Sequence, residues 1–199
     1  MKIIVLCGIK HSGKSTLGKK VAKEINALFF DIDTVIEELE SMTVRELYKT
    51  QGKDAFMQAE TRATKAILAE LQSKNKGQTA LISTGGGICD NEAALEALQN
   101  TKPLMIFLDV PKEIAFSRIK DNALKTQSMP AYISDKNPQN EDEEKTIFYS
   151  YYEKRKEKYL SFCKKEIQVN TEKNYALSTQ KNVEKILSLI AESAFLEYP

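Results

Sequence analysis

Residues 8–15 read G-I-K-H-S-G-K-S and match the pattern G-x-x-x-x-G-K-[ST] of a phosphate-binding loop. In such a loop the backbone N–H groups point inward at the positive end of the following helix, which suits a polyphosphate. We expect the Lys14 ammonium to reach the β- and γ-phosphates and the Ser15 hydroxyl to bind Mg²⁺. The pattern therefore predicts that the loop binds a nucleotide through Gly8, His11, Ser12, Gly13, Lys14, Ser15 and Thr16.

Two aspartates, Asp31 and Asp33, end the second apolar run of the chain, A-L-F-F-D-I-D. In an extended segment, residues i and i+2 share a face, so both carboxylates are expected to point into one cleft. Asp31 would then hold Mg²⁺ together with Ser15, directly or through water, because this ion prefers oxygen ligands. Asp33 would orient an acceptor hydroxyl and take its proton. Helix capping is the alternative role, and only one of the two can be the immediate cap.

Three consecutive glycines, Gly85, Gly86 and Gly87, follow a third apolar run at 79–84. Glycines at the carboxyl end of a strand let the backbone approach a ligand closely. The alternative is a flexible turn. We favour a ligand site, because three glycines in succession exceed what a turn requires.

Five apolar runs and the amphipathic helices between them must position these residues. The runs lie at 2–7, 27–33, 79–84, 104–110 and 166–170. The main helical patterns lie at about 15–26, 54–71, 92–99 and 177–194. This alternation predicts a three-layer α/β fold, with a five-stranded parallel sheet and helices on both faces. Ligands of such folds bind beyond the carboxyl ends of the strands, where the phosphate loop, the two aspartates and the glycines all lie.

Capping signals mark the starts of two further helices. Thr34 with Glu37, and Thr43 with Glu46, have the spacing of capping boxes. We expect Gly52 to end the second of these helices, because glycine suits the left-handed conformation that follows a helix.

Residues 122–144 differ in character from the rest of the chain. They are polar, lack a helical period and include two prolines and the acidic run 141–144, which we expect to face solvent. Such a segment is typical of a mobile lid, and we predict one lid within a single domain of residues 1–199. A shorter polar loop is expected at 73–77, and helical periodicity resumes at about Lys145.

The composition excludes several classes of protein. The formal net charge is +1, which gives no support to a nucleic-acid or membrane-surface partner. No signal peptide and no membrane-spanning stretch is visible, so we predict a cytoplasmic protein, and we expect a monomer. The cysteines at 7, 89 and 163 lack the spacing of a zinc site. The single histidine, His11, is expected to turn its side chain to solvent rather than to act in catalysis.

A phosphate loop is compatible with three classes of function. These are phosphoryl transfer to a small molecule, nucleotide hydrolysis coupled to motion or signalling, and nucleotide binding without turnover. The chain is too short for the added modules of a motor, and no N-K-x-D motif for reading guanine is present. A small-molecule kinase is therefore favoured.

The order and spacing of five segments resemble the shikimate kinase family over nearly the whole chain. The segments are G-I-K-H-S-G-K-S-T-L-G at 8–18, F-F-D-I-D-T-V-I-E at 29–37, F-M-Q-A-E at 56–60, S-T-G-G-G at 83–87 and Y-E-K-R-K-E-K-Y at 152–159. The resemblance implies the P-loop kinase fold, the use of ATP with Mg²⁺, and phosphorylation of a hydroxyl of a cyclic hydroxy acid. Its implied reaction is the conversion of shikimate to shikimate 3-phosphate.

The resemblance also implies roles for individual residues. Asp33 would be the base that holds the acceptor, with Lys14 acting on the phosphates and Asp31 near the metal. The backbone of Gly85–Gly87 would line the acceptor pocket, and Glu60 would support it. The alternative for Glu60 is an outward ion pair with a lysine.

Three further positions match binding residues of the family. Arg155 resembles the arginine that grips the substrate carboxylate, although it could instead be one more solvated charge among neighbouring lysines. Arg118 matches the position that packs on adenine, with a surface helix residue as the alternative. Tyr175, with its neighbour Asn174, is the expected second adenine contact.

Two methionines depart from the pattern that the resemblance implies. The family usually has arginine after the phenylalanine of the 56–60 motif, where this chain has Met57, and an Arg-Pro pair in the lid, where this chain has Met129. Methionine cannot form a bidentate pair with a carboxylate. Lys125 or Lys136 would be the replacement for the lid arginine.

Three hypotheses therefore remain, in this order. The first is an ATP-dependent shikimate kinase with a divergent acceptor site. The second is a kinase of the same fold for another hydroxylated metabolite. The third is a nucleotide-binding protein with little turnover.

Overall fold

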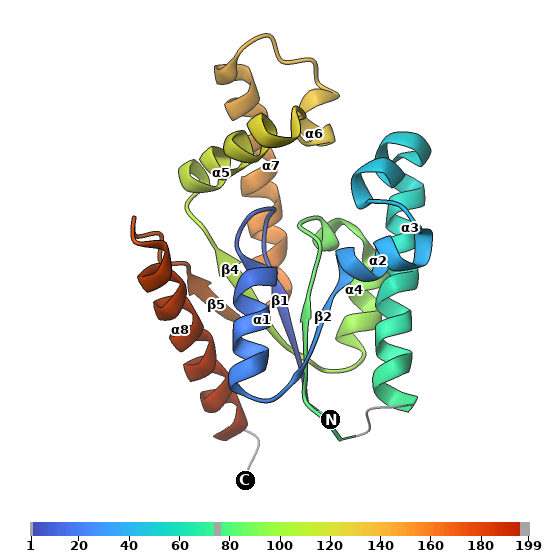
Figure 1. The fold of residues 1–199 in the computed structure, drawn as a ribbon, viewed down its shortest axis with the longest axis vertical. Coiled ribbons are helices and arrows are strands. Elements are labelled where there is room, and N and C mark those ends of the chain that lie inside the picture. Colours follow the sequence, from blue (N-terminus) through green and yellow to red (C-terminus); the bar gives the residue numbers. More distant parts are fainter. Residues whose placement is uncertain (1, 74–76, 196–199) are drawn as a thin grey trace.

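A five-stranded, fully parallel sheet forms the centre of the protein in a computed structural model that describes residues 2–73 and 77–195 (Figure 1). The strand order is β2-β3-β1-β4-β5. The strands are β1 (Ile3–Cys7), β2 (Leu28–Asp31), β3 (Ala80–Ser83), β4 (Leu104–Asp109) and β5 (Lys165–Gln168). The sheet predicted from the five apolar runs is confirmed, with strand ends that differ by one to a few residues. Of the polar loop predicted at 73–77, residues 74–76 lie outside the described part.

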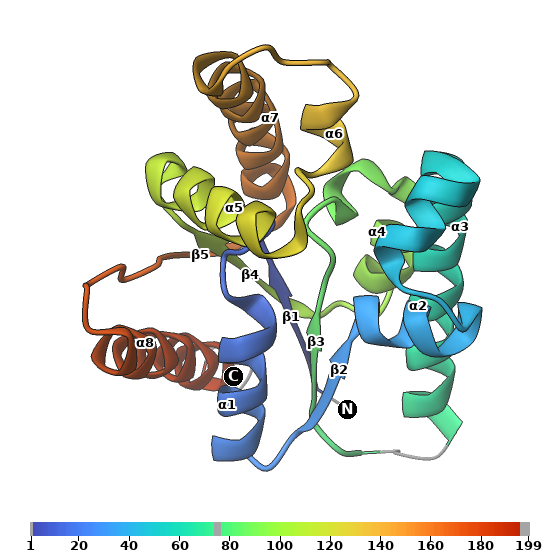
Figure 2. The same ribbon diagram turned by 45° about the horizontal axis from the view of Figure 1, so that its top comes forward.

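Helices cover both faces of this sheet. They are α1 (Lys14–Glu24), α2 (Ile32–Glu40), α3 (Val44–Ser73), η1 (Ile88–Asp90, a 3₁₀ turn), α4 (Glu92–Gln99), α5 (Lys112–Thr126), α6 (Ala131–Ser134), α7 (Glu141–Phe162) and α8 (Tyr175–Phe195). In both views α1 and α8 lie side by side on one face, and α4 and the lower part of α7 lie on the other (Figures 1 and 2). The predicted three-layer α/β fold is therefore confirmed.

The central strand β1 shows why the apolar runs form this sheet. All five of its residues are buried, as a strand with neighbours on both sides and helices on both faces requires. Its register pairs Val5 with Ile82 of β3 and with Met105 of β4, so β-branched and long apolar side chains fill the core. Within the described ranges, none of the helices has the length and apolar content needed to cross a membrane.

The loops that carry the candidate residues gather beyond the carboxyl ends of the strands. The loop between β1 and α1, the start of α2 and the glycines after β3 all lie at this edge (Figure 1). Helices α2 and α3 rise on one side of it, and α5, α6 and the start of α7 rise on the other (Figure 2). Residues far apart in sequence therefore face one another across this edge.

Helix α2 begins three residues earlier than its predicted capping box implies. Asp31, not Thr34, is the N-cap, and its carboxylate accepts a hydrogen bond from the backbone N–H of Asp33 at 3.1 Å. Glu37 instead accepts from the backbone N–H of Val44 at 3.2 Å and ties the end of the α2–α3 turn. The predicted box at Thr34 was wrong because aspartate at the strand end satisfies the free N–H first.

The second predicted box is confirmed. The Thr43 N–H donates to Glu46 at 2.9 Å, and the Glu46 N–H donates to the Thr43 hydroxyl at 3.2 Å. Gly52 adopts φ 83° and ψ −177°, so it ends one helical segment of α3 and a second segment begins directly after it.

The segment predicted as a lid contains more helix than its polar sequence indicates. Helix α5 continues to Thr126, α6 occupies residues 131–134, and α7 begins at Glu141 rather than at Lys145. The Asn140 side chain caps α7 by accepting from the Glu143 N–H at 3.0 Å. The acidic run 141–144 forms the first turn, where negative charge is favourable toward the helix dipole.

Candidate active site

The phosphate loop curls around the ammonium group of Lys14. This side chain is 7% exposed, and its Nζ donates to the carbonyl oxygens of Gly8 and Ile9, both at 2.8 Å. A third contact reaches the Ser12 hydroxyl at 3.3 Å. Burial lowers the pKa of Lys14 to about 8, because the charged form loses its hydration. The loop thus holds a cation whose partners are neutral groups.

The start of α1 has the features of an anion site. Its N-cap is Gly13 in the left-handed conformation, with φ 95°, so no side chain caps the free N–H groups. The first turn carries no acidic residue. A Cβ added at Gly8 would lie 2.8 Å from the Leu108 carbonyl oxygen, so only glycine allows this loop path. Uncapped N–H groups beside a buried ammonium fit a polyphosphate.

Oxygen donors suited to Mg²⁺ lie next to the loop. The Ser15 and Ser83 hydroxyls are 3.4 Å apart, and Ser83 pairs in register with Asp31 of β2. Ser15 and Asp31 are therefore brought to the same end of the sheet. In the described ranges, no group of three His, Cys, Asp or Glu side chains forms an all-protein metal site. The donors present fit an ion that shares its coordination with phosphates and water.

Asp33 lies in the first turn of α2 and not in an extended segment with Asp31. The prediction that both share one face of a strand was therefore wrong, because the chain becomes helical at Ile32. The Asp33 side chain nevertheless lines a pocket next to the phosphate loop. Burial, and then the Asp31 carboxylate, raise the pKa of Asp33, whereas Lys14 and Lys10 act in the opposite direction.

Glu60 faces the same pocket from α3 and is 1% exposed. Its Oε2 accepts a hydrogen bond from Asn91 Nδ2 at 2.9 Å, and its buried Oε1 has no partner among the described residues. Burial raises the pKa of Glu60 to about 7. The alternative of an outward ion pair with a lysine is excluded by this burial.

The glycine run after β3 passes close to these groups. A Cβ at Gly85 would lie 2.7 Å from Glu60 Oε1 and 3.2 Å from Asp33 Oδ1. A Cβ at Gly86 would lie 2.6 Å from the Lys10 backbone nitrogen. Backbone rather than side chains therefore forms this wall of the pocket.

Arg155 enters the pocket from α7 and is not a solvated charge. Its side chain is 16% exposed, and its Nε donates to Asp90 Oδ2 at 3.0 Å. The guanidinium also lies 5.4 Å from the ring centre of Tyr132 and 5.7 Å from that of Tyr151. Because Tyr132 belongs to α6, this contact joins the predicted lid segment to the pocket.

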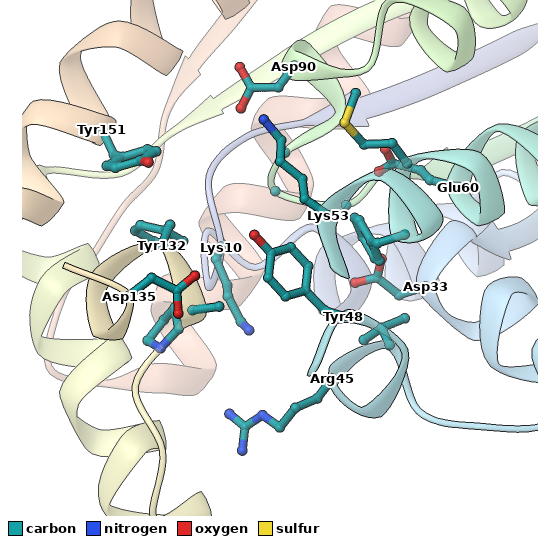
Figure 3. Close-up of a pocket in the computed structure, with 18 of the residues that line it drawn as sticks. Lys10, Asp33, Arg45, Tyr48, Lys53, Glu60, Asp90, Tyr132, Asp135 and Tyr151 are labelled. Atoms are coloured by element: carbon teal, nitrogen blue, oxygen red, sulfur yellow. The ribbon is translucent and has the colours of Figure 1, made fainter. Parts of the chain in front are cut away.

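The pocket formed by these elements encloses about 450 Å³. In Figure 3, side chains from the phosphate loop, α2, α3 and α6 converge on it. Met57 lines it, whereas Met129 is not among the lining residues and packs against the core. Of the two lysines predicted to replace the lid arginine, Lys136 lines the pocket and Lys125 does not.

Several lining residues were not identified from the sequence. They are Lys10, Val44, Arg45, Tyr48, Lys53, Phe56, Asp90, Pro130, Ala131, Tyr132, Asp135 and Tyr151. Tyr151 could have been found, because it precedes Arg155 by four residues on one helix and so shares its face. Tyr132 and Asp135 had no such signal, since the path of the polar segment depends on its packing against α7.

The residues expected at the nucleotide base lie on the other side of the phosphate loop. Arg118 of α5 is half-buried, and its Nη1 donates to the His11 carbonyl oxygen at 3.0 Å. His11 is not turned to solvent as predicted: its Nε2 is buried without a partner among the described residues, and burial lowers its pKa to about 4. The His11 backbone is in the left-handed region, with φ 62°.

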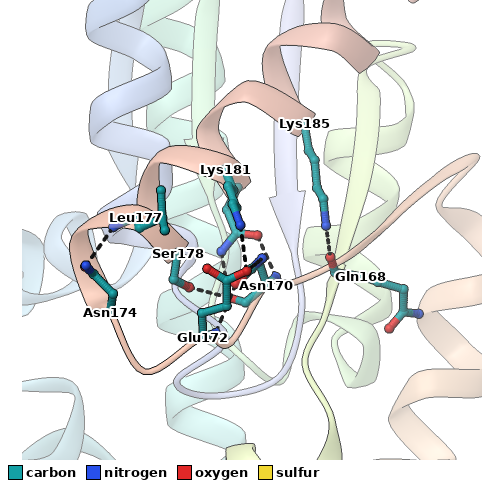
Figure 4. Close-up of polar contacts among 9 residues, drawn as sticks. Gln168, Asn170, Glu172, Asn174, Leu177, Ser178, Lys181 and Lys185 are labelled. Carbon is teal, nitrogen blue, oxygen red and sulfur yellow. Dashed lines mark hydrogen bonds and ion pairs between the residues drawn. The ribbon is translucent and has the colours of Figure 1, made fainter.

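Tyr175 is 69% exposed at the start of α8. Burial lowers the pKa of Arg118, and the nearby Tyr175 acts in the opposite direction. The turn before it is fixed by polar contacts (Figure 4). The Asn182 carboxamide bonds both the N–H and the C=O of Asn170, at 2.7 and 3.0 Å. The Asn174 side chain accepts from the Leu177 N–H at 3.1 Å. This turn therefore presents Tyr175 on a rigid support.

Fold and site together define a P-loop protein of the α/β kinase fold. A family model described as "Shikimate kinase" matches residues 10–191, and the chain belongs to the shikimate kinase family. Over 119 residues it is 37% identical to the shikimate kinases of Staphylococcus aureus strains JH9 and N315. That alignment covers 60% of this chain, which thus spans 63% of the length of these curated relatives.

Solved structures agree with this assignment. A shikimate kinase from Bacteroides thetaiotaomicron superimposes with a TM-score of 0.76 at 25% identity, over 96% of this chain and 98% of the other. The shikimate kinase from Acinetobacter baumannii, solved in complex with shikimate, gives a TM-score of 0.73 at 22% identity, over 97% and 94% of the two chains. The fold predicted from the sequence is confirmed.

Proposed function

We propose that this protein transfers the γ-phosphoryl group of ATP to a hydroxyl of shikimate, giving shikimate 3-phosphate and ADP. The position of Asp33 carries the proposal. Its partly buried carboxyl group lines the pocket between the phosphate loop and Gly85, close enough to Lys14 for their charges to interact. Membership in the family and the 37% identity to S. aureus shikimate kinases support the same reaction.

The phosphate loop would bind the triphosphate. The Lys14 ammonium would exchange its carbonyl partners for oxygens of the β- and γ-phosphates, and the uncapped N–H groups of α1 would donate to the others. Ser15 and Asp31 are the residues that would hold Mg²⁺. When bound, this ion neutralises charge on the phosphate oxygens. Arg118 and Tyr175 would contact the adenine, with His11 and Thr16 completing the nucleotide site.

Asp33 would act as the general base. It would accept the proton of the acceptor hydroxyl as that oxygen forms a bond to the γ-phosphorus, while the bond between the γ-phosphorus and the bridging oxygen breaks and ADP leaves with the electron pair. A base works best when its pKa approaches the working pH. Burial moves the pKa of Asp33 in that direction.

Arg155 and the glycine wall would position the acceptor. The Arg155 guanidinium would bind the acceptor's carboxylate, and the backbone of Gly85, Gly86 and Gly87 would contact its ring. Glu60 would support this wall from behind, since a Cβ at Gly85 would lie only 2.7 Å from its Oε1.

The presence of Met57 supports a second candidate function, in which the acceptor is not shikimate. Met57 places an apolar thioether in the pocket, where a charged side chain would bind an acidic acceptor more tightly. Loss of one charged hydrogen bond costs about 1.5–3 kcal/mol, or roughly ten- to a hundredfold in affinity. The second candidate is therefore a kinase of the same fold for another hydroxylated metabolite.

The test is ADP release with Mg-ATP and a panel of acceptors. Shikimate at millimolar concentration is expected to stimulate ADP release, with a phosphorylated product seen by mass spectrometry. Stimulation by a polyol, a sugar acid or a nucleoside monophosphate, but not by shikimate, would establish the second candidate. If no acceptor increases ATP use, the protein is a nucleotide-binding module with little turnover, and the proposed reaction is wrong.

A further inference from the structure

The end of the pocket at Arg155 has less free positive charge than its residues suggest. Arg155 Nε donates to Asp90 Oδ2 at 3.0 Å, Arg155 Nη2 forms an ion pair with the same oxygen at 3.0 Å, and Lys158 donates to Asp90 Oδ1 at 2.6 Å. The Nε edge of the guanidinium, which can bind a carboxylate through two parallel hydrogen bonds, is therefore occupied. Only the remaining edge of Arg155 is left for a ligand.

Lys53 brings an unused cation to the same end. It lies four residues before Met57 on the second segment of α3, so both side chains share one face of the helix, and both line the pocket. Among the residues that the structure describes, no carboxylate or hydrogen-bond acceptor pairs with its ammonium. In Figure 3 the Lys53 ammonium points toward the end of the pocket where Asp90 lies.

The break at Gly52 directs Lys53 into the pocket. With φ 83°, Gly52 interrupts α3 immediately before Lys53. Tyr48, on the segment before the break, and Lys53, after it, line the same cavity. Lys53 is thus the first residue of a helical segment at the pocket, four residues before Met57.

The apolar neighbours would strengthen an ionic contact at this place. Met57, Phe56 and Tyr151 line the same pocket as Lys53. Charges attract more strongly as water leaves the space between them. An acceptor that fills the pocket would exclude water from the Lys53 ammonium, which is exposed in the ligand-free protein.

We propose that Lys53 binds the acceptor's carboxylate together with Arg155, so that the acid end of the acceptor lies between a guanidinium on α7 and an ammonium on α3. This inference rests on the proposed function and assigns a specificity-determining residue to it. The lysine ammonium is a point charge on a flexible side chain, whereas the arginine guanidinium is planar and binds a carboxylate in a fixed geometry. The pocket therefore recognises a hydroxy acid by its charge and tolerates displacement of the carboxylate better than a pair of arginines would.

The test compares Lys53→Gln with Lys49→Gln. Lys49 is exposed on the same helix, one turn earlier, and does not line the pocket. We expect Lys53→Gln to raise the KM and the Kd for shikimate at least about tenfold, as for the loss of a charged hydrogen bond. Lys49→Gln is expected to leave both unchanged. The KM for ATP should stay the same in both variants, and Lys53→Arg should retain most of the affinity.

The methyl ester of shikimate separates a carboxylate contact from general damage. Because the ester has no charge, wild type and Lys53→Gln should bind it equally by calorimetry with ADP present. Adding Met57→Arg to Lys53→Gln should recover affinity for the acid and not for the ester.

These experiments distinguish failure of the role proposed for Lys53 from failure of the proposed function. If wild type phosphorylates shikimate and Lys53→Gln has the KM of Lys49→Gln, the role of Lys53 is wrong and the proposed function stands. If Lys53→Gln weakens the acid and the ester equally, the contact is not with the carboxylate. A wild type that neither binds nor phosphorylates shikimate overturns the proposed function and this inference together.

Discussion

The Asp31 carboxylate caps helix α2 by accepting a hydrogen bond from the backbone N–H of Asp33 at 3.1 Å. This bond gives the two aspartates different environments although only Ile32 lies between them. Asp31 is held at the strand end beside Ser83, and Asp33 is carried by the first helical turn into the pocket. Their substitution is therefore expected to have different consequences.

Asp33→Asn should abolish most turnover while keeping the fold. Asparagine cannot take a proton, and loss of a general base reduces kcat by about 10²–10⁴-fold. Nucleotide affinity should be unchanged, and thermal stability near pH 8 should be equal or higher, since burial already disfavours the Asp33 charge. Steady-state kinetics and calorimetry on the same preparation measure both effects.

Asp31→Asn is the matched control. Asparagine is as good an N-cap as aspartate, so α2 should start at the same place. Activity should fall because of weaker Mg²⁺ binding, and higher Mg²⁺ concentrations should restore it. If Asp33→Asn retains wild-type kcat, the assignment of the base is wrong.

The roles of Asp31 and Asp33 show how far the site could be predicted from the sequence. The strand, the phosphate loop and the acid pair were all visible as patterns. The role of each acid depended on where α2 begins, and that start is decided by which side chain first satisfies the free N–H groups. If the strand continued through Ile32, Asp31 and Asp33 would point to the same face. Because the helix starts at Ile32, their side chains point in different directions.

Glu60→Gln is expected to change how stability depends on pH. The pKa of Glu60 is about 7 in the folded protein, above its ordinary value of 4.5. The folded state therefore binds more protons than the unfolded state between these values, and this group lowers the stability as pH rises from about 4.5 to 7. At pH 8 the penalty is on the order of 3 kcal/mol, at 1.36 kcal/mol for each unit of pKa.

The neutral glutamine keeps an acceptor for Asn91 and does not ionise. The free energy of unfolding of the Glu60→Gln variant should exceed that of wild type at pH 8 and approach the wild-type value at pH 4.5. Urea unfolding at several pH values gives this difference. A constant difference across the range would show that Glu60 is not the group responsible. Glu70→Gln, at an exposed position of the same helix, is the matched control.

Gly85→Ala should damage the acceptor site through a steric conflict. The added Cβ would lie 2.7 Å from Glu60 Oε1, and Glu60 cannot move freely because Asn91 holds its other oxygen. We expect a loss of about 1–3 kcal/mol in stability, as for other overpacked sites. The KM for the acceptor should rise, with little change in the KM for ATP.

A second substitution tests that explanation. Glu60→Ala removes the carboxylate that the new methyl group meets, so the double variant should regain part of the stability lost in Gly85→Ala. Gly87→Ala is the graded control, because its Cβ would lie 3.3 Å from the flexible end of Arg155. Equal effects of the two glycine variants would contradict the argument.

The segment predicted as a lid was the least predictable part of the fold. Its polar composition hid the end of α5, the short α6 and the first turn of α7. The acidic run at 141–144 was expected to face solvent, and its first three residues are exposed; the run also forms the first turn of α7, where Asn140 caps the helix and the dipole favours negative residues. Tyr132 reaches Arg155 because α6 packs on α7, which no local pattern encodes.

Nucleotide binding should be linked to proton uptake by Lys14. Burial lowers the pKa of Lys14 to about 8 in the ligand-free protein, and phosphates placed against the ammonium would raise it again. Below pH 8 the group is already charged, so ADP affinity should be nearly constant. Above pH 8 each binding event must take up a proton, and the affinity should fall by up to about tenfold per pH unit. Calorimetry in buffers of different ionisation enthalpy measures this uptake directly.

Lys14→Arg provides the control, because arginine stays protonated throughout this range. Its ADP affinity, though weakened by altered geometry, should not change between about pH 7 and 9.5, since the phosphates themselves titrate near pH 6, below this window. Lys14→Met should bind weakly, with no proton uptake. Proton uptake that is absent in wild type, or equal in wild type and Lys14→Arg, would mean that Lys14 does not meet the phosphates, and the nucleotide site would have to lie elsewhere.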